Sequence, residues 1–161
     1  MQRDAAQEQK IIHGIVIEPM CKNDVDAVVA VERRAFSAPW TEGMFVSEIS
    51  HHPLSYVARY EGHVVGYIMV RIVFEEMSLM NLAVDLPWRK KGLGEALIWH
   101  AIGIGRRTGI ERVILEVRIS NVTAQNLYKK LGFQKVGCRR NYYNDPTEDA
   151  LIFEHGTNRL L

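Results

Sequence analysis

A short segment rich in cations and glycine lies between an apolar run that ends at Val84 and a helical pattern that begins at about Gly92. The segment reads Arg89-Lys90-Lys91-Gly92-Leu93-Gly94-Glu95. The N–H groups of a helix N-terminus point outward, the helix dipole favours anions, and glycine lets a phosphate approach the backbone. The pattern therefore predicts a pyrophosphate site, and a solvated basic turn is the alternative. It contains neither the glycine fingerprint of dinucleotide sites nor a P-loop.

A single carboxylate interrupts the apolar, β-branched segment Val113-Ile114-Leu115-Glu116-Val117-Arg118. Strand alternation places Glu116 and Arg118 on the same face. Burying a carboxylate in such a strand is costly unless another group pairs with it. Two interpretations follow: Glu116 pairs with Arg118 across solvent, or Glu116 is a general base in a cleft.

Tyr128 lies on an apolar helical stripe with Leu127 and Leu131. It is either a core aromatic, or a phenol whose ring lies in the core and whose hydroxyl donates a proton in a cleft. The histidines form no constellation with the spacing of metal ligands, so we expect no metal site. No motif for an activated nucleophile is found either, which favours chemistry without a covalent enzyme intermediate.

Hydrophobic periodicity predicts the elements that must position these residues. Strands are expected at residues 11–17, 56–60, 64–73, 77–84, 113–117, 133–138 and 150–154. Helices are expected after Asn23-Asp24, after Thr41, from Leu93 to Gly109, and from Ser120 or Asn121 to Gly132. The two strand–helix–strand passages near residues 80–138 predict an α/β fold whose mixed sheet carries helices on both faces.

Length and composition are those of one soluble domain. The chain has 161 residues, 47% hydrophobic and 24% charged, and we expect one domain over residues 11–161 after a flexible N-terminal segment of residues 1–10. Cys21 and Cys138 are expected to be reduced thiols. The apolar run at 11–17 is too short for a membrane span and lacks the flanks of a secretory signal. We therefore expect a cytoplasmic protein without a membrane partner.

Charge is distributed unevenly along the chain, although the formal net charge is only +1. Residues 89–140 hold 12 Lys/Arg and 3 Asp/Glu, whereas both flanking parts are acidic. This pattern predicts an anionic ligand on the middle part and a cationic partner elsewhere, and scattered solvated charges are the alternative. Basic tracts interleaved with aromatics are absent, so we expect no direct nucleic-acid contact. The acids expected to face a basic peptide are Glu42, Glu48, Asp145, Glu148 and Asp149.

Several motifs together resemble the GNAT acetyltransferase superfamily, over roughly residues 54–154. They are Asn81-Leu82-Ala83-Val84, Arg89-Lys90-Lys91-Gly92-Leu93-Gly94, Glu116 in its strand, Asn121, and Leu127-Tyr128-Lys129-Lys130-Leu131-Gly132-Phe133. Ala38-Pro39-Trp40-Thr41 is a weaker match. Leu115-Glu116-Val117-Arg118-x-Ser120-Asn121 and Arg140-Asn141-Tyr142-Tyr143, followed by Glu148-Asp149-Ala150, resemble protein N-terminal acetyltransferases of the RimI type. Glu95 and the bulky Leu86-Pro87-Trp88 depart from the family pattern.

The resemblance implies an acyl-CoA N-acyltransferase fold with a V-shaped split between the strands at 77–84 and 113–117. Acetyl-CoA would be the acetyl donor. Its implied binding residues are Leu82, Ala83, Val84, Arg89, Lys90, Lys91, Gly92, Leu93, Gly94, Glu95 and Asn121. The resemblance makes Glu116 the general base and Tyr128 the general acid, and Trp40, Tyr142 and Tyr143 would line the path of the peptide substrate.

The function implied by the resemblance is acetylation of a protein N-terminus. The expected substrate is the N-terminal alanine of a small-subunit ribosomal protein. One alternative is an N-terminal acetyltransferase of broader specificity, and a small-amine or lysine acetyltransferase is a weaker one. A further alternative is a non-catalytic GNAT module that binds acyl-CoA or a peptide. Against that module stand the intact Glu116, Asn121 and Tyr128, because a sensor needs no positioned acid and base.

Overall fold

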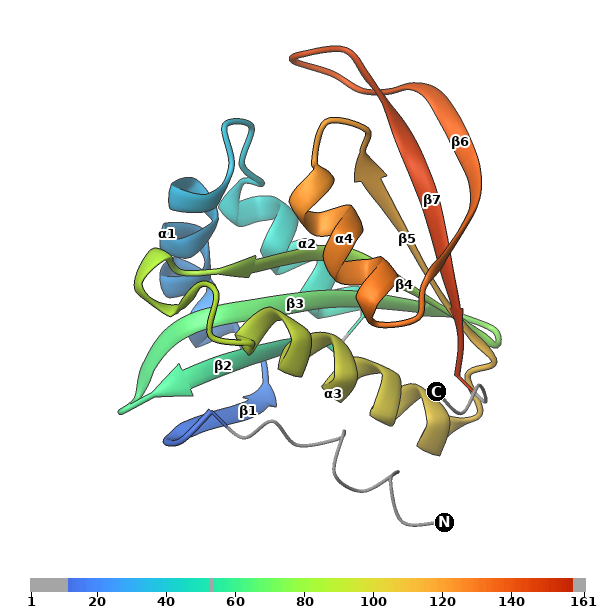
Figure 1. Cartoon of the computed structure of the whole chain (residues 1–161). Helices are drawn as coiled ribbons and strands as arrows, with labels where there is room; N and C mark the ends of the chain where they lie inside the picture. Colours follow the sequence, from blue (N-terminus) through green and yellow to red (C-terminus); the bar gives the residue numbers. More distant parts are fainter. Residues whose placement is uncertain (1–11, 53, 158–161) are drawn as a thin grey trace.

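The structure is a computed structural model that describes residues 12–52 and 54–157 (Figure 1). A seven-stranded sheet has the strand order β1-β2-β3-β4-β5-β7-β6. The strands are β1 Ile15–Pro19, β2 Tyr56–Tyr60, β3 His63–Val73, β4 Glu76–Val84, β5 Arg112–Arg118, β6 Gln134–Tyr143 and β7 Glu148–Gly156. The helices are α1 Val25–Ala35, α2 Glu42–His51, α3 Leu93–Thr108 and α4 Val122–Lys130, with 3-10 turns at Lys22–Asp24 and Leu86–Trp88. The predicted order of helices and strands is confirmed.

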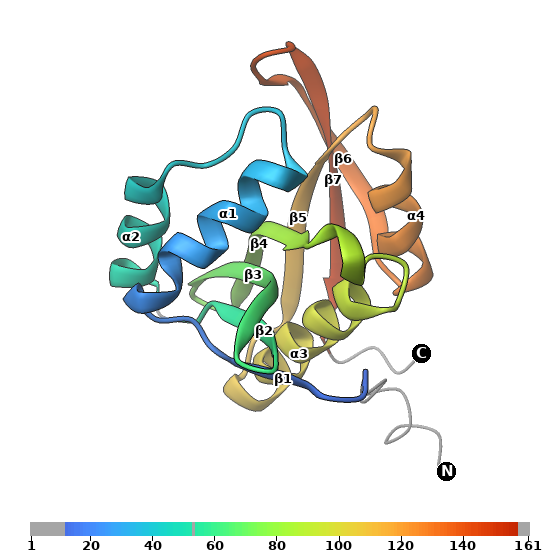
Figure 2. The ribbon, with the colours of Figure 1, turned by 90° about the vertical axis from the view of Figure 1, so that its left-hand side faces the viewer.

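Helices cover both faces of the sheet, as predicted. Helices α1 and α2 lie on one face, and α3 and α4 lie on the other (Figure 2). Each face has its own apolar core. Phe45 of α2 and Tyr67 of β3 are fully buried in the first, and Leu97 of α3 and Phe153 of β7 are fully buried in the second. The sheet thus holds two independent layers together, and functional groups on opposite faces reach one another only where the sheet opens.

Helix α3 follows directly from its sequence pattern. Its buried positions recur every three or four residues along the helix, and the helix ends at Gly109, whose φ of 80° suits a left-handed C-cap. Gly105 lies inside the helix, where glycine is less favourable than alanine. A Cβ at Gly105 would lie 3.3 Å from Cβ of Ile110, so close packing against the following residues accounts for this glycine.

The sheet opens between its two parallel strands. Strands β4 and β5 pair only over Glu76–Leu79 and Arg112–Leu115. Beyond those residues, β4 keeps its pairing with β3, and Glu116–Arg118 keep theirs with β7. The register between β3 and β4 shifts at this point and leaves Met80 as an extra residue, and such a bulge bends a strand and increases its twist. The predicted V-shaped split is therefore present.

Three boundaries differ from the sequence analysis. The first strand begins at Ile15, because Gly14 with φ of 83° ends a turn immediately before it. Strands β6 and β7 are longer than predicted, since their pairing resumes at Tyr143 and Glu148 after an irregular stretch. Strand β6 is an edge strand whose residues are mostly exposed, so it lacks the apolar alternation that reveals a strand.

The N-terminal segment predicted for residues 1–10 lies outside the described residues. None of the helices within residues 12–52 and 54–157 is long and apolar enough to cross a membrane.

Candidate active site

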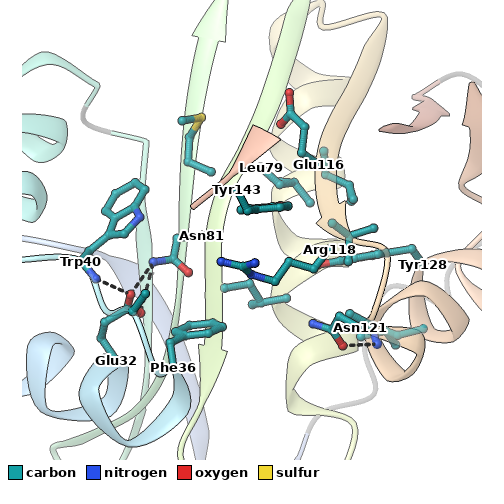
Figure 3. Close-up of a pocket in the computed structure, with 17 residues that line it drawn as sticks. Glu32, Phe36, Trp40, Leu79, Asn81, Glu116, Arg118, Asn121, Tyr128 and Tyr143 are labelled. Carbon is teal, nitrogen blue, oxygen red and sulfur yellow. Dashed lines mark hydrogen bonds between the residues drawn. The ribbon is translucent and has the colours of Figure 1, made fainter. Parts of the chain in front are cut away.

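A cavity of about 360 Å³ occupies the split between β4 and β5 (Figure 3). Its walls come from α1 and the loop after it, from the diverging strands, from α4 and from the end of β6. The lining residues are Glu32, Phe36, Ala38, Trp40, Leu79, Met80, Asn81, Leu82, Leu115, Glu116, Val117, Arg118, Asn121, Ala124, Leu127, Tyr128 and Tyr143. The structure thus brings the predicted Glu116, Tyr128, Trp40 and Tyr143 to one cavity, whereas Tyr142 does not line it.

The carboxylate of Glu116 projects from the end of β5 that has left β4. Its Oε1 lies 3.6 Å from Nη1 of Arg139 on β6, a side chain that is 55% exposed. The interpretation that Glu116 pairs with Arg118 is wrong, because Arg118 pairs with Glu148 at 3.2 Å. A long ion pair to an exposed arginine is weak in water. The contact with Arg139 can therefore break when Glu116 interacts with a ligand in the cavity.

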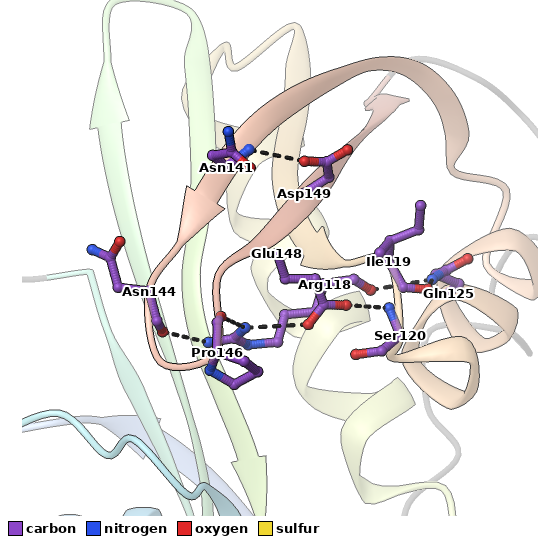
Figure 4. A network of polar contacts seen from close by, with 9 residues as sticks. All are labelled: Arg118, Ile119, Ser120, Gln125, Asn141, Asn144, Pro146, Glu148 and Asp149. Atoms are coloured by element: carbon purple, nitrogen blue, oxygen red, sulfur yellow. Dashed lines mark hydrogen bonds and ion pairs between the residues drawn. The ribbon is translucent and has the colours of Figure 1, made fainter.

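Arg118 fixes the β6–β7 hairpin to the end of β5 (Figure 4). Its guanidinium donates to the carbonyls of Asn144 and Pro146, at 3.2 and 3.1 Å, and to the carboxylate of Glu148. It also lies 4.3 Å from the centre of the Tyr143 ring. These contacts position Tyr143 at the cavity.

Two acids that the sequence analysis placed at the peptide entrance are engaged inside this hairpin. Glu148 accepts a hydrogen bond from the backbone N–H of Ser120. The side chain and backbone of Ser120, together with Arg118, hold the pKa of the Glu148 carboxyl below its usual value. Asp149 accepts the N–H of Asn141 at 2.8 Å. On α2, Glu48 pairs with Arg71. Three of the five carboxylates that were expected to attract a basic peptide are therefore already engaged in contacts within the protein.

Tyr128 lies between the apolar core and the cavity. Its ring packs against Phe133 and Phe153, with ring centres 5.7 and 6.3 Å apart. The residue also lines the cavity. Burial raises the pKa of Tyr128 to about 12, so the phenol keeps its proton at neutral pH and can act as a donor.

The aromatic residues predicted to guide a peptide lie at different depths. Burial raises the pKa of Tyr143 to about 12, and its ring meets that of the more exposed Tyr142 at 5.1 Å. Across the cavity, the Trp40 ring packs on Phe45 at 5.4 Å. Trp40 thus lines the cavity from the connection after α1, and Tyr143 lines it from the end of β6.

A second cavity, of about 830 Å³, adjoins the first and reaches the N-terminus of α3. Phe36, Leu82, Asn121, Ala124 and Leu127 line both cavities. The second is lined by all eleven residues predicted to bind the cofactor, that is by Leu82, Ala83, Val84, Arg89, Lys90, Lys91, Gly92, Leu93, Gly94, Glu95 and Asn121. The arrangement offers an elongated ligand one path from the helix N-terminus to Glu116.

The backbone before α3 is shaped to receive an anion. Lys90 and Gly92 have φ values of 58° and 86°, and Gly92 is the N-cap, without a side-chain hydrogen bond to the first turn. The first N–H groups of a helix have no partner within it. Left-handed residues next to such a terminus turn successive N–H groups toward one concavity, where the helix dipole also favours negative charge.

Side chains of the loop before α3 contact neighbouring parts of the protein. Nε of Arg89 donates to the carbonyl of Val84 at 2.9 Å, and Nζ of Lys91 lies 5.2 Å from the centre of the Trp88 ring. Trp88, which departs from the family pattern, packs on Tyr60 at 4.7 Å. The other departure, Glu95, pairs with Lys130 on α4 at 2.8 Å. Lys130 compensates the Glu95 charge beside the predicted phosphate site.

The sequence pattern of the Acetyltransferase (GNAT) family matches residues 25–133. The chain belongs to this family. A [ribosomal protein bS18]-alanine N-acetyltransferase of Escherichia coli strain K12 is 37% identical over 131 residues, 80% of this chain and 88% of its own. An N-alpha-acetyltransferase of Sulfurisphaera tokodaii is 35% identical over 143 residues, 80% of this chain and 85% of its own.

Solved structures agree with this placement. The crystal structure of the ribosomal-protein-S18-alanine N-acetyltransferase from Escherichia coli superposes with a TM-score of 0.84 at 34% identity, covering 91% of this chain and 96% of its own. The protein is thus a GNAT enzyme of the N-terminal acetyltransferase type, and the prediction of an enzyme rather than a binding module is confirmed. GNAT acetyltransferases use acetyl-CoA. No group of His, Cys, Asp and Glu side chains in the described part of this GNAT chain could hold a metal ion.

Sequence reasoning missed one carboxylate in the site of this GNAT enzyme. Glu32 of α1 is 1% exposed and lines the first cavity. A signal was present, because Val25, Val28, Val29, Glu32 and Phe36 follow one helical stripe, and a glutamate on an apolar stripe needs partners. Those partners come from other elements, which the sequence does not place.

Asn121 has a structural role beside its predicted one. Its Oδ1 accepts the N–H of Ala124 at 3.1 Å and so caps α4. The residue is exposed and lines both cavities. Capping uses the side-chain oxygen, and the amide nitrogen stays available to a ligand that passes between the cavities.

Proposed function

We propose that this GNAT enzyme transfers the acetyl group of acetyl-CoA to the α-amino group of an N-terminal alanine on a small-subunit ribosomal protein. The observation that carries the proposal is the split between β4 and β5. Glu116 and Tyr128 line it, and it adjoins the cavity at the N-terminus of α3. The similarity to an enzyme named for bS18-alanine acetylation supports the substrate.

The second cavity would receive the donor. The N–H groups of residues 90–95 would hold the pyrophosphate, with Arg89, Lys90 and Lys91 adding positive charge. The pantetheine arm would then run between Asn121 and the edge of β4 that has lost its pairing with β5. An extended chain of amides can hydrogen-bond to such an edge as an additional strand would.

In the proposed reaction, the residues of the first cavity handle two protons. Glu116 accepts a proton from the α-ammonium, which leaves an amine able to attack the thioester carbonyl. An N–H group on the free edge of β4 stabilises the negative charge that develops on the carbonyl oxygen. The C–N bond forms in this attack, and the nitrogen of the tetrahedral intermediate then loses its second proton to solvent. The C–S bond breaks as Tyr128 donates its proton to the sulfur, Tyr128 regains a proton from solvent, and Glu116 releases the one that it accepted.

A broader N-terminal specificity is the second candidate. The relative from Sulfurisphaera tokodaii is similar at 35% identity, and its name specifies no N-terminal residue. The first cavity contains Phe36, Ala38 and Trp40 on its α1 side, a mostly apolar surface that a small side chain would contact.

A peptide panel tests both candidates. Peptides that differ only in the first residue would be assayed with acetyl-CoA, beside an N-terminally blocked peptide that carries a free lysine. We expect the alanine peptide to give the highest kcat/KM and the blocked peptide to give no product. Similar kcat/KM values for several first residues would favour the broader specificity. Acetylation of the blocked peptide as fast as of the free ones would overturn transfer to the α-amine.

A further inference from the structure

The side chain of Glu32 is buried and accepts hydrogen bonds from three other parts of the fold, two of which, at Trp40 and Asn81, are drawn in Figure 3. Its Oε1 accepts the backbone N–H of Trp40 at 2.8 Å, from the connection between α1 and α2. Nδ2 of Asn81, on β4, lies 3.2 Å from Oε1 and 3.1 Å from Oε2. The hydroxyl of Tyr67, on β3, donates to Oε2.

The two oxygens of the Glu32 side chain together accept from all three partners. A carboxylate has about four acceptor sites on two oxygens and no donor, whereas an amide of the same shape has one oxygen and an NH₂ group. None of the cations within residues 12–52 and 54–157 forms an ion pair with Glu32, so these hydrogen bonds alone offset its desolvation. An apolar residue on this helical stripe would fold more easily, which points to a use for the carboxylate.

The partners of Glu32 lie on two walls of the first cavity. Trp40 belongs to the wall that would meet the peptide, and Asn81 follows the bulge at Met80, where β4 leaves β5. We infer that Glu32 is a positioning residue. It holds Trp40, on the wall that would contact the peptide, at a fixed distance from Asn81, on the wall that would contact the acetyl group. This contact would fix the spacing between the amine and the thioester. The inference rests on the proposed acetyl transfer, since it assigns those two walls to its two substrates.

The oxygens of Glu32 are held by these donors, so the inference gives Glu32 no part in proton transfer. Its effect would be geometric. Displacement of a bound reactant by about 1 Å is enough to slow a reaction about 10²-fold. Release of Trp40 or Asn81 would produce such a displacement without removing any group that touches the reacting atoms.

The test is Glu32→Gln, compared with Asp24→Asn as a matched control. Asp24 precedes α1, is 5% exposed, and its carboxylate accepts hydrogen bonds from Cys21 and Arg59, away from both cavities. For Glu32→Gln we expect kcat/KM for the peptide to fall about 10²-fold, with the Kd of coenzyme A little changed. Asp24→Asn should lower Tm and leave the kcat/KM of the folded protein near that of the wild type.

A compensating variant separates positioning from stability. In Glu32→Gln with Asn81→Asp, the amide at position 32 donates to the carboxylate at position 81. The hydrogen bond is restored with donor and acceptor exchanged. We expect this double variant to recover kcat/KM relative to Glu32→Gln, and Asn81→Asp alone to be impaired because it opposes two carboxylates. A loss of Tm in Glu32→Gln with unchanged kcat/KM would overturn the inference.

One further measurement does not depend on the reaction. Amide hydrogen exchange at Trp40, recorded without substrate, should be faster in Glu32→Gln than in the wild type and the Asp24→Asn control. If the wild type acetylates no α-amine while this exchange rises, the proposed function fails and the positioning of the loop stands. If the exchange at Trp40 is unchanged, the positioning role fails whatever the activity.

Discussion

The two cavities of this GNAT enzyme are built by contacts of different range in the sequence. Around the N-terminus of α3, Arg89 bonds to Val84 and Lys91 covers Trp88, all within residues 84–95. Around the first cavity, which we propose to be the catalytic side of the enzyme, Glu32 and Asn81 are 49 positions apart, and Arg118 and Glu148 are 30 apart. The loop before α3 is thus held mainly by short-range contacts, with Glu95–Lys130 and Trp88–Tyr60 as longer ones, whereas the first cavity depends on contacts between distant elements.

This difference predicts that changes on the donor side alter affinity for coenzyme A, and that changes on the catalytic side alter turnover or peptide binding. The variants below test the division, from the largest expected effect to the smallest.

Glu116→Gln should have the largest effect. Loss of a general base typically lowers the rate about 10²–10⁴-fold, and we expect that loss in kcat with little change in the Kd of coenzyme A. Steady-state kinetics with an alanine peptide and calorimetric titration of coenzyme A provide the two measurements. Glu154→Gln, on β7 and outside both cavities, is the control. Turnover near that of the wild type across neutral and alkaline pH would remove Glu116 from the proposed role.

Tyr128→Phe should keep the ring contacts with Phe133 and Phe153 and lose the proton donor. We expect kcat to fall about 10²-fold, with Tm nearly unchanged. If Tm drops and turnover holds, Tyr128 is a core aromatic only.

The same variant carries a prediction about pH. Burial raises the pKa of Tyr128 from 10.0 to about 12, so the unfolded chain loses this proton first as pH rises. The free energy of unfolding should therefore decline between pH 10 and about 12, and Tyr128→Phe should reduce that decline. An ultraviolet titration of the tyrosines should show that Tyr128→Phe lacks one phenol that ionises well above pH 10 in the wild type. If the missing phenol instead ionises near pH 10, the burial of the Tyr128 hydroxyl would be contradicted.

Arg118→Lys tests the hairpin on the catalytic side. Lysine keeps the charge but cannot reach the carbonyls of Asn144 and Pro146 and the carboxylate of Glu148 together. We expect KM for the peptide to rise by about an order of magnitude while the Kd of coenzyme A stays the same. An equal loss of affinity for both substrates would mean that the two sides are not separate.

Reversal of two loop charges, Arg89→Glu with Lys91→Glu, tests the donor side. Weaker binding of acetyl-CoA is expected, with less effect on kcat, and the difference from wild type should shrink at 1 M salt, where the screening length is about 3 Å. Lys22→Glu with Lys135→Glu makes the same change of net charge on exposed residues outside both cavities. Equal affinity in both double variants would reduce the basic loop to a solvated turn.

Asn121 adjoins both cavities and also caps α4. Its variants should have the smallest effects, and they should separate stability from coenzyme A binding. Asn121→Ala removes the cap of α4 and should cost about 1 kcal/mol of stability. Asn121→Ser keeps a capping oxygen and loses the amide nitrogen. We expect the serine variant to retain Tm and to bind coenzyme A more weakly. Wild-type affinity in the serine variant would leave Asn121 with its capping role alone.

Several features were determined by the sequence itself. Periodicity gave the order of helices and strands, because the residues that create an amphipathic face lie within a few positions of one another. The predicted donor residues from 82 to 95 line one cavity for the same reason, since a strand end, a short loop and a helix start are continuous in the chain. Glu116 was recognisable because a carboxylate contrasts with its apolar strand.

Only the tertiary structure decided which groups meet across elements. Insertion of β7 between β5 and β6 gives Glu116 a neighbour in Arg139 instead of Arg118. The bulge at Met80 opens the sheet, and the packing of α1 on that face brings Glu32 to Asn81. Short-range periodicity fixes which face of an element is apolar. The partners on that face depend on how separate layers pack, and the free energy of that packing is spread over residues far apart in the chain.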